Sequence, residues 1–390
     1  MKIKGAGRPF FVSLYCGYSF LFYFCSWIRV LTMIRNILII GILCGLFAFV
    51  SCKSDFEVND KWRDAPAIFC VLDKSQNMQY VKVNKCFIGN IPASEMASVS
   101  DSLFYDCDVQ VKLKRMQGNS VLKTWNFRAV DSIPKESGYF ASDKNTIWVG
   151  TPDLADGYTY ELEVNIDDGR IIAKGSTGLV DGCRITAPAE NAPKIDLARY
   201  NNDFGIKYVP GNNANLQEVN VYFNYLEIMA SGDTVPKSVR IYNNQSYRVS
   251  SDSYSTVEQS FSVASFYSAL AAQISASDES VVKRLVRMPD CMTFSVSTAD
   301  ENLYTYMQVT KPSNGIAQDR PIFTNIYVDE SSKMPGGEAY GLIASRSTVS
   351  RSKALGSETL DSISRGIHTK NLKFPPWTDN YYITHKPYNK

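Results

Sequence analysis

Histidine, the usual general base at neutral pH, occurs only twice in this 390-residue chain, as His368 and His385. A Ser-His-Asp or Cys-His site needs its base held rigidly against the nucleophile. Both histidines lie in a C-terminal stretch without a clear secondary-structure pattern, so catalysis of this kind is not expected. The sequence also lacks the HExxH, GxSxG, phosphate-loop and Rossmann glycine motifs, and it nominates no catalytic residue.

Paired carboxylates are the other arrangement that could do chemistry, because the two acids of a glycosidase need only meet in space. The obvious clusters are Asp167-Asp168 and Asp300-Glu301. Each lies where a turn is expected, so we predict that both are solvated turns. An envelope glycoside hydrolase with paired carboxylates is therefore the alternative function and not the leading one.

The cysteines beyond residue 52 are odd in number, which leaves at least one thiol free or paired with another molecule. None forms a Cys-x-x-Cys pair, so no metal site, redox site or cofactor is expected. Cys70 lies in the apolar run 67–72 and is predicted to be a small buried hydrophobic residue. These cysteines are Cys70, Cys86, Cys107, Cys183 and Cys291.

Aromatic residues are the remaining candidates, because rings on a sheet face can stack on sugars. In an alternating strand half of the rings must point into the core, so only outward members could bind a ligand. Tyr222 is outward if Phe223 and Tyr225 are inside. We take Tyr222, Trp125 and Tyr304 as candidate binding residues.

Two apolar stretches precede the polar part of the chain, 10–28 and 37–50. Only the second follows a short basic segment, which begins at Met33, and has the layout of a secretory signal. It is shorter than the ~20 residues of a membrane-spanning helix. We therefore predict a signal peptide at 33–51, with 1–32 as an upstream extension of the reading frame.

The signal ends in Phe49-Val50-Ser51-Cys52, which resembles the box of bacterial lipoproteins, where the cysteine is lipidated and becomes the new N-terminus. Cys52 is therefore predicted to be a lipid anchor that attaches the protein to a membrane. The alternative is an ordinary cysteine in an uncleaved anchor. Residues 52–61 would form a polar tether.

The remaining chain is expected to be rich in β-structure. Strands are indicated between residues 66 and 178 by alternating apolar and charged residues, as in 109–114 and 160–166. Asp167-Asp168-Gly169 supports the positive φ of a tight hairpin. The net charge of +2, from 41 basic and 39 acidic residues, argues against a nucleic-acid partner.

The pattern predicts two antiparallel β-sandwich domains of immunoglobulin or transthyretin type, with minor α-structure. The first spans 62–186. The second spans 187–345, begins with a proline-containing linker, and includes one amphipathic helix near 261–275. A short helical turn is expected within 90–105 and a helical or turn segment at 302–309. Residues 346–390 are predicted to be a loosely ordered tail.

The segments 62–72 (WRDAPAIFCVL) and 80–89 (YVKVNKCFIG) resemble the opening of a family of uncharacterised Bacteroidetes cell-envelope lipoproteins. Residues 302–309 and 319–326 resemble its second half. The resemblance spans 52–345 and implies an all-β lipoprotein on the periplasmic side or the surface of the outer membrane. That family has no assigned activity, so it supplies no catalytic residues.

The sequence thus predicts a membrane-anchored, non-enzymatic envelope lipoprotein that serves in binding or assembly. Its partner would be a glycan, as in nutrient uptake, or another envelope protein. A glycan-binding protein should show a surface ring of Trp and Tyr. A structural adhesin should instead expose a long edge strand that accepts a strand from another chain.

Overall fold

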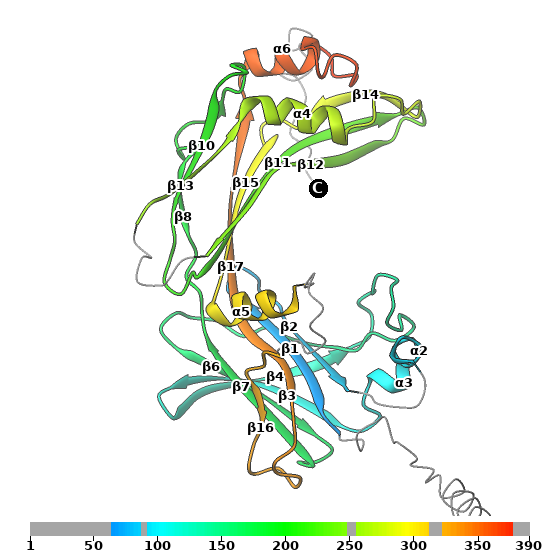
Figure 1. Ribbon diagram of the computed structural model, residues 1–390, viewed down its shortest axis with the longest axis vertical. Helices are drawn as coiled ribbons and strands as arrows, with labels where there is room; N and C mark the ends of the chain where they lie inside the picture. The colour runs from blue at the N-terminus through cyan, green and yellow to red at the C-terminus, as the bar shows by residue number, and fades with distance from the viewer. Residues whose placement is uncertain (1–63, 87–91, 248–254, 312–321, 377–390) are drawn as a thin grey trace, which may run out of the picture. The chain divides into compact units, whose positions relative to one another are not determined.

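The computed structural model describes residues 64–86, 92–247, 255–311 and 322–376. The predicted signal peptide, Cys52, the tether and His385 lie outside these ranges. The described chain is mostly β-structure with short helices, as predicted (Figure 1). Twelve strands of a mixed 14-stranded sheet run in the order β12-β11-β15-β17-β1-β2-β5-β4-β3-β6-β7-β16, and the other two, β14 and β9, pair with β11 and β17. A separate sheet has three strands.

The first hydrophobic core lies between two groups of strands that are joined through β4, which pairs with both β3 and β5. Inward side chains such as Ile68, Leu113 and Leu162 from both groups fill this core, which makes it a sandwich. The strands are β1 (Pro66–Asp73), β2 (Gln79–Lys85), β3 (Val109–Gln117), β4 (Ser120–Val130), β5 (Ile147–Gly150), β6 (Thr159–Ile166), β7 (Ile171–Gly178) and β16 (Ile326–Val328).

The predicted hairpin at Asp167-Asp168-Gly169 is confirmed. These residues have φ of 54°, 48° and 81° and connect β6 to β7, with Ile166 opposite Ile171. Aspartate and glycine tolerate this left-handed conformation, which a tight hairpin requires. The helical turn expected within 90–105 is also present, as α2 (Ala93–Ala97) and α3 (Ser100–Leu103).

The second core is covered by the three-stranded sheet and by helices. Phe223, Phe266 and Phe294 are fully buried in it. The predicted amphipathic helix is α4 (Val263–Gln273), capped by the Ser262 hydroxyl, which accepts from the Ser265 N–H at 3.1 Å. The strands are β8 (Arg184–Ala187), β9 (Lys194–Ile195), β10 (Asp203–Val209), β11 (Leu216–Met229), β12 (Thr234–Tyr247), β13 (Val257–Ser262), β14 (Val281–Val286) and β15 (Met292–Ala299).

One long strand, β17 (Tyr340–Leu355), takes part in both cores. Its first half pairs parallel with β1, and its second half pairs antiparallel with β15. Ile343 lies in the first core and Leu355 in the second. Ile326, Ala339 and Ile343 belong to the first core although they lie within 187–345, so a division at residue 187 does not separate the two cores.

The prediction of a loose tail from residue 346 was wrong for the described part of that segment. β17 continues to Leu355 and is followed by α6 (Ser357–Arg365), and Leu360, Ile363 and Phe374 are buried in the second core. The strand is hard to recognise because its side chains are largely serine and arginine. These hydroxyls pair across the sheet, with Ser350 Oγ 3.2 Å from Ser295 Oγ.

The prediction of a solvated turn is confirmed for Asp167-Asp168 and wrong for Asp300, which is only 7% exposed. Asp300 caps α5 (Glu301–Thr310), the helix expected at 302–309. Its carboxylate accepts from the Leu303 and Ser345 N–H groups at 2.9 Å and from the Thr177 hydroxyl at 2.7 Å. Burial raises the pKa of Asp300 above its usual value.

All the cysteines in the described ranges are free thiols, and Cys70 is buried at 1% exposure, as predicted. In the same ranges, no helix combines the length and the apolar character needed to cross a bilayer.

Candidate functional site

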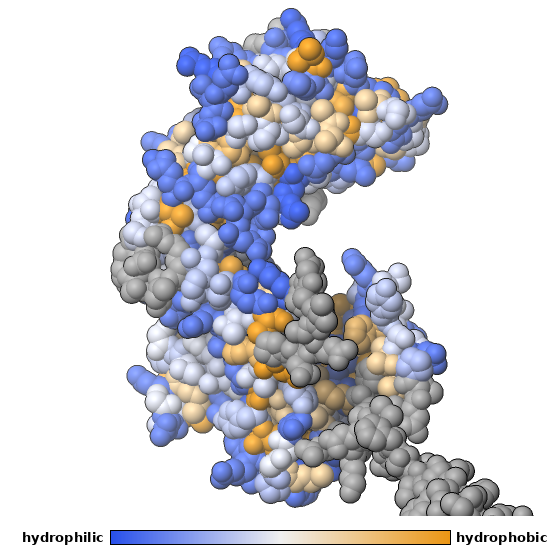
Figure 2. Space-filling view, viewed as in Figure 1, coloured by the Kyte–Doolittle hydropathy of each residue, from blue (hydrophilic) through white to orange (hydrophobic). Residues whose placement is uncertain are grey.

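The outer face of β1 carries a partly exposed aromatic side chain. Ile68, Cys70 and Leu72 point into the first core, whereas Phe69 points outward and is 37% exposed. Its ring meets Tyr306 of α5 edge to face, with centroids 5.8 Å apart. Hydrophobic residues gather over β1 and β17 beneath α5, shown in orange in Figure 2. Phe69 therefore lies within an exposed apolar surface.

On the α5 side of Phe69 lies a pocket of about 480 Å³, here named the helix-side pocket. Its wall is almost entirely apolar or aromatic, because α5 and β17 both turn such side chains toward β1. The main contributors are Phe69, Tyr306, Val309, Ile322, Phe323 and Tyr340. A concavity of this size is in the range of small-molecule sites.

On the β2 side of Phe69 lies a second pocket of about 410 Å³, here named the lysine-side pocket. Phe69 and Cys86 line both pockets. The far wall comes from α3 and from the connection between β4 and β5, which anchors to α2 where the Ala141 N–H donates to the Ala97 carbonyl at 2.8 Å. The side chains that decide its character are Lys82, Lys85, Lys135, Phe104 and Phe140.

Lys82 is held at the base of the lysine-side pocket. Its ammonium donates to Asn145 Oδ1 at 2.7 Å and to the Thr146 carbonyl at 3.1 Å, and it lies 4.6 Å from the centroid of the Phe104 ring. Burial, with the positive charge of Lys135 beside it, lowers the pKa of Lys82 to about 8, although Asp131 acts in the opposite direction. Lys82 is therefore charged at neutral pH, and its hydrogen-bond partners carry no negative charge that would balance it.

Cys86 is the half-buried thiol shared by the two pockets. Burial and the negative charges of Asp64 and Glu338 raise its pKa, so it is a neutral thiol at physiological pH. A lowered pKa favours nucleophilic cysteines, so this environment does not activate Cys86, and the thiol forms part of the wall of both pockets.

The sequence-predicted binding residues lie on three separate elements and outside both pockets. The Trp125 ring on β4 lies between Arg115 and Lys123, at 5.2 and 5.0 Å. Tyr304 on α5 stacks on Tyr247 with centroids 3.9 Å apart. Tyr222 on β11 is half-buried. Its neighbours Phe223 and Tyr225 are buried, which is the arrangement under which Tyr222 was expected to point outward.

The residues that form the two pockets were missed. Tyr306 belongs to the aromatic segment 304–306, but Tyr304 was chosen instead. Phe69 lies in the continuous apolar run 67–72, so the sequence does not mark it as outward, and only the structure shows that its neighbours occupy the inward positions. Phe104 and Phe140 lie in connections, where no periodic pattern marks them.

The buried acidic side chains form ion pairs or helix caps that stabilise the fold. Asp73 pairs with Arg346 at 3.1 Å, and Glu227 pairs with Arg284 at 2.8 Å. Neither residue lines the two pockets, and Asp300 caps a helix. Within the described residues, no three His, Cys, Asp or Glu side chains are grouped so that they could hold a metal ion.

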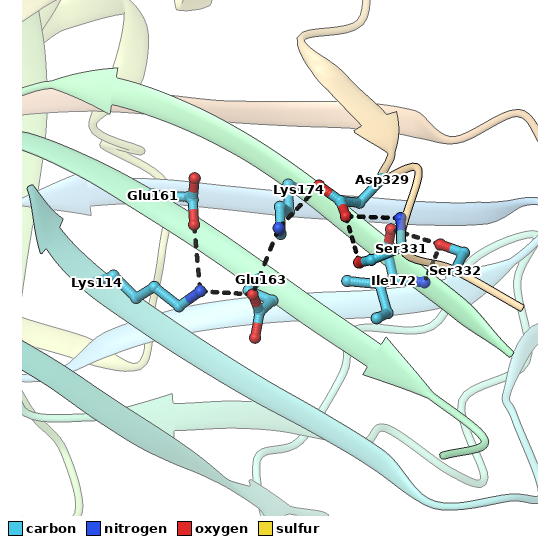
Figure 3. A network of polar contacts seen from close by, with 8 residues as sticks. All are labelled: Lys114, Glu161, Glu163, Ile172, Lys174, Asp329, Ser331 and Ser332. Carbon is cyan, nitrogen blue, oxygen red and sulfur yellow. Dashed lines mark hydrogen bonds and ion pairs between the residues drawn. The ribbon is translucent and has the colours of Figure 1, made fainter. Parts of the chain in front are cut away.

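A charged ladder covers the outer face of β3, β6 and β7 (Figure 3). Lys114 lies between Glu161 and Glu163 at 3.3 and 2.5 Å, and Lys174 joins Asp329 at 2.8 Å. Cross-strand pairs of opposite charge stabilise a sheet modestly. Because each of these five charged side chains has an oppositely charged neighbour, we assign the ladder a structural role.

No protein-family model and no curated protein matches the sequence. Among solved structures, a match is found with the C-terminal globular domain of an oligosaccharyltransferase from Pyrococcus abyssi. The identity is 12%, the match covers 58% of this chain and 45% of that chain, and the TM-score is 0.21. This chain thus spans less than half of the length of that domain, and a similarity this low supports no inference about function.

Proposed function

We propose that this protein is a non-enzymatic binding protein and that the helix-side and lysine-side pockets form its binding site. One observation carries the proposal: the exposed Phe69 ring stands between two adjoining pockets and lines both. Part of the Phe69 ring is in contact with water between two largely apolar pockets. A ligand that covers the ring would remove this apolar surface from water, which favours binding.

The cell envelope is the proposed location, with the protein attached as an outer-membrane lipoprotein through acyl chains on Cys52. The support comes from the sequence: the signal layout of 33–51, the residues before Cys52 and the resemblance of 52–345 to Bacteroidetes lipoproteins. Several acyl chains are needed for stable attachment, because a single chain binds a membrane only marginally.

The two pockets favour binding over hydrolysis, because none of the described residues that line them is Asp or Glu. A paired-carboxylate mechanism has no acid to use at this site. The described residues that line the pockets also include no tryptophan, and their rings are mainly phenylalanine. An apolar ligand therefore fits this wall better than the glycan that an aromatic platform of Trp and Tyr would favour.

Strand addition is less well supported than ligand binding. β12 is a long edge strand, as an adhesin would require. However, Pro236 has no N–H, and Gln273 Nε2 of α4 donates to the Arg240 carbonyl at 2.9 Å. Part of this edge is therefore unavailable to an incoming strand.

Recovery of a bound compound tests the proposed function. The full chain is purified from its cells as wild type, as Phe69→Asp and as Tyr327→Asp, and organic extracts are compared by mass spectrometry. Tyr327 is a matched control because it is an exposed aromatic residue on β16, outside both pockets. We expect a compound that wild type and Tyr327→Asp retain and Phe69→Asp loses. Equal extracts from all three proteins would contradict the proposal.

A further inference from the structure

The lysine-side pocket carries an excess of positive charge. Lys82, Lys85 and Lys135 line it, and no acidic residue does in the part of the chain that the structure describes. Lys144 adds a fourth ammonium, 5.5 Å from the Phe104 ring centroid. Lysines on a protein surface are usually solvated, but here they surround the aromatic wall of a concavity. A ligand in this pocket would therefore meet several cations at one end.

The hydrogen-bond partners of the Lys82 and Lys135 ammonium groups are neutral. Lys82 donates to an amide oxygen and a backbone carbonyl, and Lys135 donates to the Ala141 carbonyl at 2.9 Å. An ammonium has three donors, so each retains donor capacity beyond these bonds. Within the described residues, neither lysine forms an ion pair. An anion in the pocket would supply the missing counter-charge through charge-assisted hydrogen bonds.

The helix-side pocket has the opposite character. Among the described residues that line it there is no lysine or arginine, and its wall is formed mainly by aromatic and aliphatic side chains. Because Phe69 and Cys86 line both pockets, one ligand can extend from the cationic pocket across the Phe69 ring to the apolar one. Burying an apolar body there would contribute most of the affinity.

We propose that the ligand is a small amphipathic anion, with its acidic group at Lys82 and Lys135 and its apolar body over Phe69 in the helix-side pocket. This inference rests on the proposed function, since it assigns a chemical class to the ligand of the same site. Two observations support this inference: the lysines of the lysine-side pocket complement a negative charge, and the wall of the helix-side pocket is uncharged. A neutral apolar molecule would leave the lysines without a counter-charge.

Two dyes that differ only by an acidic group test this ligand class. 8-Anilinonaphthalene-1-sulfonate is an amphipathic anion, and N-phenyl-1-naphthylamine is the same molecule without the sulfonate. Both are titrated into the full chain and followed by fluorescence. The proteins are wild type, Phe69→Ala, Lys82→Met, Lys135→Met and the control Lys123→Met, whose lysine lies over Trp125 and outside both pockets.

The sulfonate is expected to bind wild type about tenfold more tightly than the neutral dye, as charge-assisted hydrogen bonds imply. Lys82→Met and Lys135→Met should remove most of this advantage and leave the neutral dye unchanged. Phe69→Ala should weaken both dyes, and Lys123→Met neither. Raising the pH from about 7 to about 9 should weaken only the sulfonate, because Lys82 loses its charge near pH 8 beside Lys135, Lys144 and Asp131.

The outcomes separate the two proposals. If both dyes bind equally and the lysine variants change neither, while Phe69→Ala weakens both, the ligand class is wrong and the binding site stands. If Phe69→Ala changes the binding of neither dye, the site itself is contradicted together with the inference.

Discussion

Gly341 on β17 lies so close to Ile68 on β1 that a Cβ on the glycine would stand 1.8 Å from the Ile68 carbonyl oxygen. Its φ is +118°, a conformation that other residues rarely adopt. The contact is part of the parallel pairing of β1 with β17, the strand that enters both cores. Gly341 also lines the helix-side pocket, so the close contact between β17 and β1 helps to shape the proposed binding site.

Substitution of this glycine should therefore be costly. We expect Gly341→Ala to lower the free energy of unfolding by about 3 kcal/mol or more, because both backbone strain and a backbone clash result. Gly337→Ala is the matched control, since its Cβ would make ordinary contacts of 3.6 and 3.7 Å. Its effect should stay within about 0.5 kcal/mol in urea denaturation. Equal effects would show that β17 and β1 are not paired in this way.

The buried ion pair of the second core gives another prediction. Arg284 is 1% exposed, and it donates to Glu227 at 2.8 Å and to the Leu372 and Ser275 carbonyls. Arg284→Met should cost about 3–5 kcal/mol, because it leaves the Glu227 carboxylate buried without its partner.

Lys237→Met is the control for this pair. Lys237 reaches the same carboxylate only at 4.0 Å and from an exposed position, so its removal should cost less than about 1 kcal/mol. Urea denaturation of the two variants decides the matter. Similar losses would contradict the assignment of Arg284 as the structural partner of Glu227.

The charged ladder predicts a pH dependence of stability. Its hydrogen bond from Lys174 lowers the pKa of Asp329 to about 2, whereas an unfolded aspartate titrates near ~3.9. Because the folded-state pKa is the lower one, this stabilisation is complete above pH ~4 and is lost as the pH falls through about 2. Asp329→Asn should therefore be less stable than wild type by about 1 kcal/mol at neutral pH and nearly equal to it at pH ~2.

Asp168→Asn provides the comparison for that titration. Asp168 is also paired with a lysine, at 3.3 Å, but its side chain is fully exposed. Its removal should change stability little at any pH in thermal unfolding. A difference between wild type and Asp329→Asn that is independent of pH would contradict the role of the Lys174 pair.

The proposed anchor predicts a specific mature N-terminus. Mass spectrometry of the wild-type protein should find an acylated Cys52 as its first residue, and Cys52→Ala should yield an unlipidated protein. The reason is that the predicted acyl attachment requires the Cys52 thiol, which alanine lacks. An unlipidated wild-type chain that begins upstream of Met33 would contradict the anchor.

The strands and the main helix could be predicted because their periodicity is local. β6 alternates cleanly, and α4 presents Val263, Phe266 and Leu270 on one face. The end of β17 could not, because its serines resemble a loop until their partners on β15 are known. Asp300 was misassigned for a similar reason, since two of its hydrogen-bond partners, Thr177 and Ser345, are remote in sequence.

The candidate site was harder to predict than the fold. Its walls come from β1, β2, α3, α5, β17 and the connection between β4 and β5, which only the tertiary structure brings together. A single aromatic residue in a connection, such as Phe140, carries no local signal of a pocket.

Covalent filling of the two pockets tests the central claim most directly. Cys86 lines both, so a bulky maleimide attached there should exclude any ligand. Wild type and Cys86→Ser are treated alike, mass spectrometry verifies the adduct on Cys86, and binding of 8-anilinonaphthalene-1-sulfonate is then measured. We predict that alkylated wild type loses the binding that treated Cys86→Ser keeps. Undiminished binding by wild type fully modified at Cys86 would contradict the proposed site.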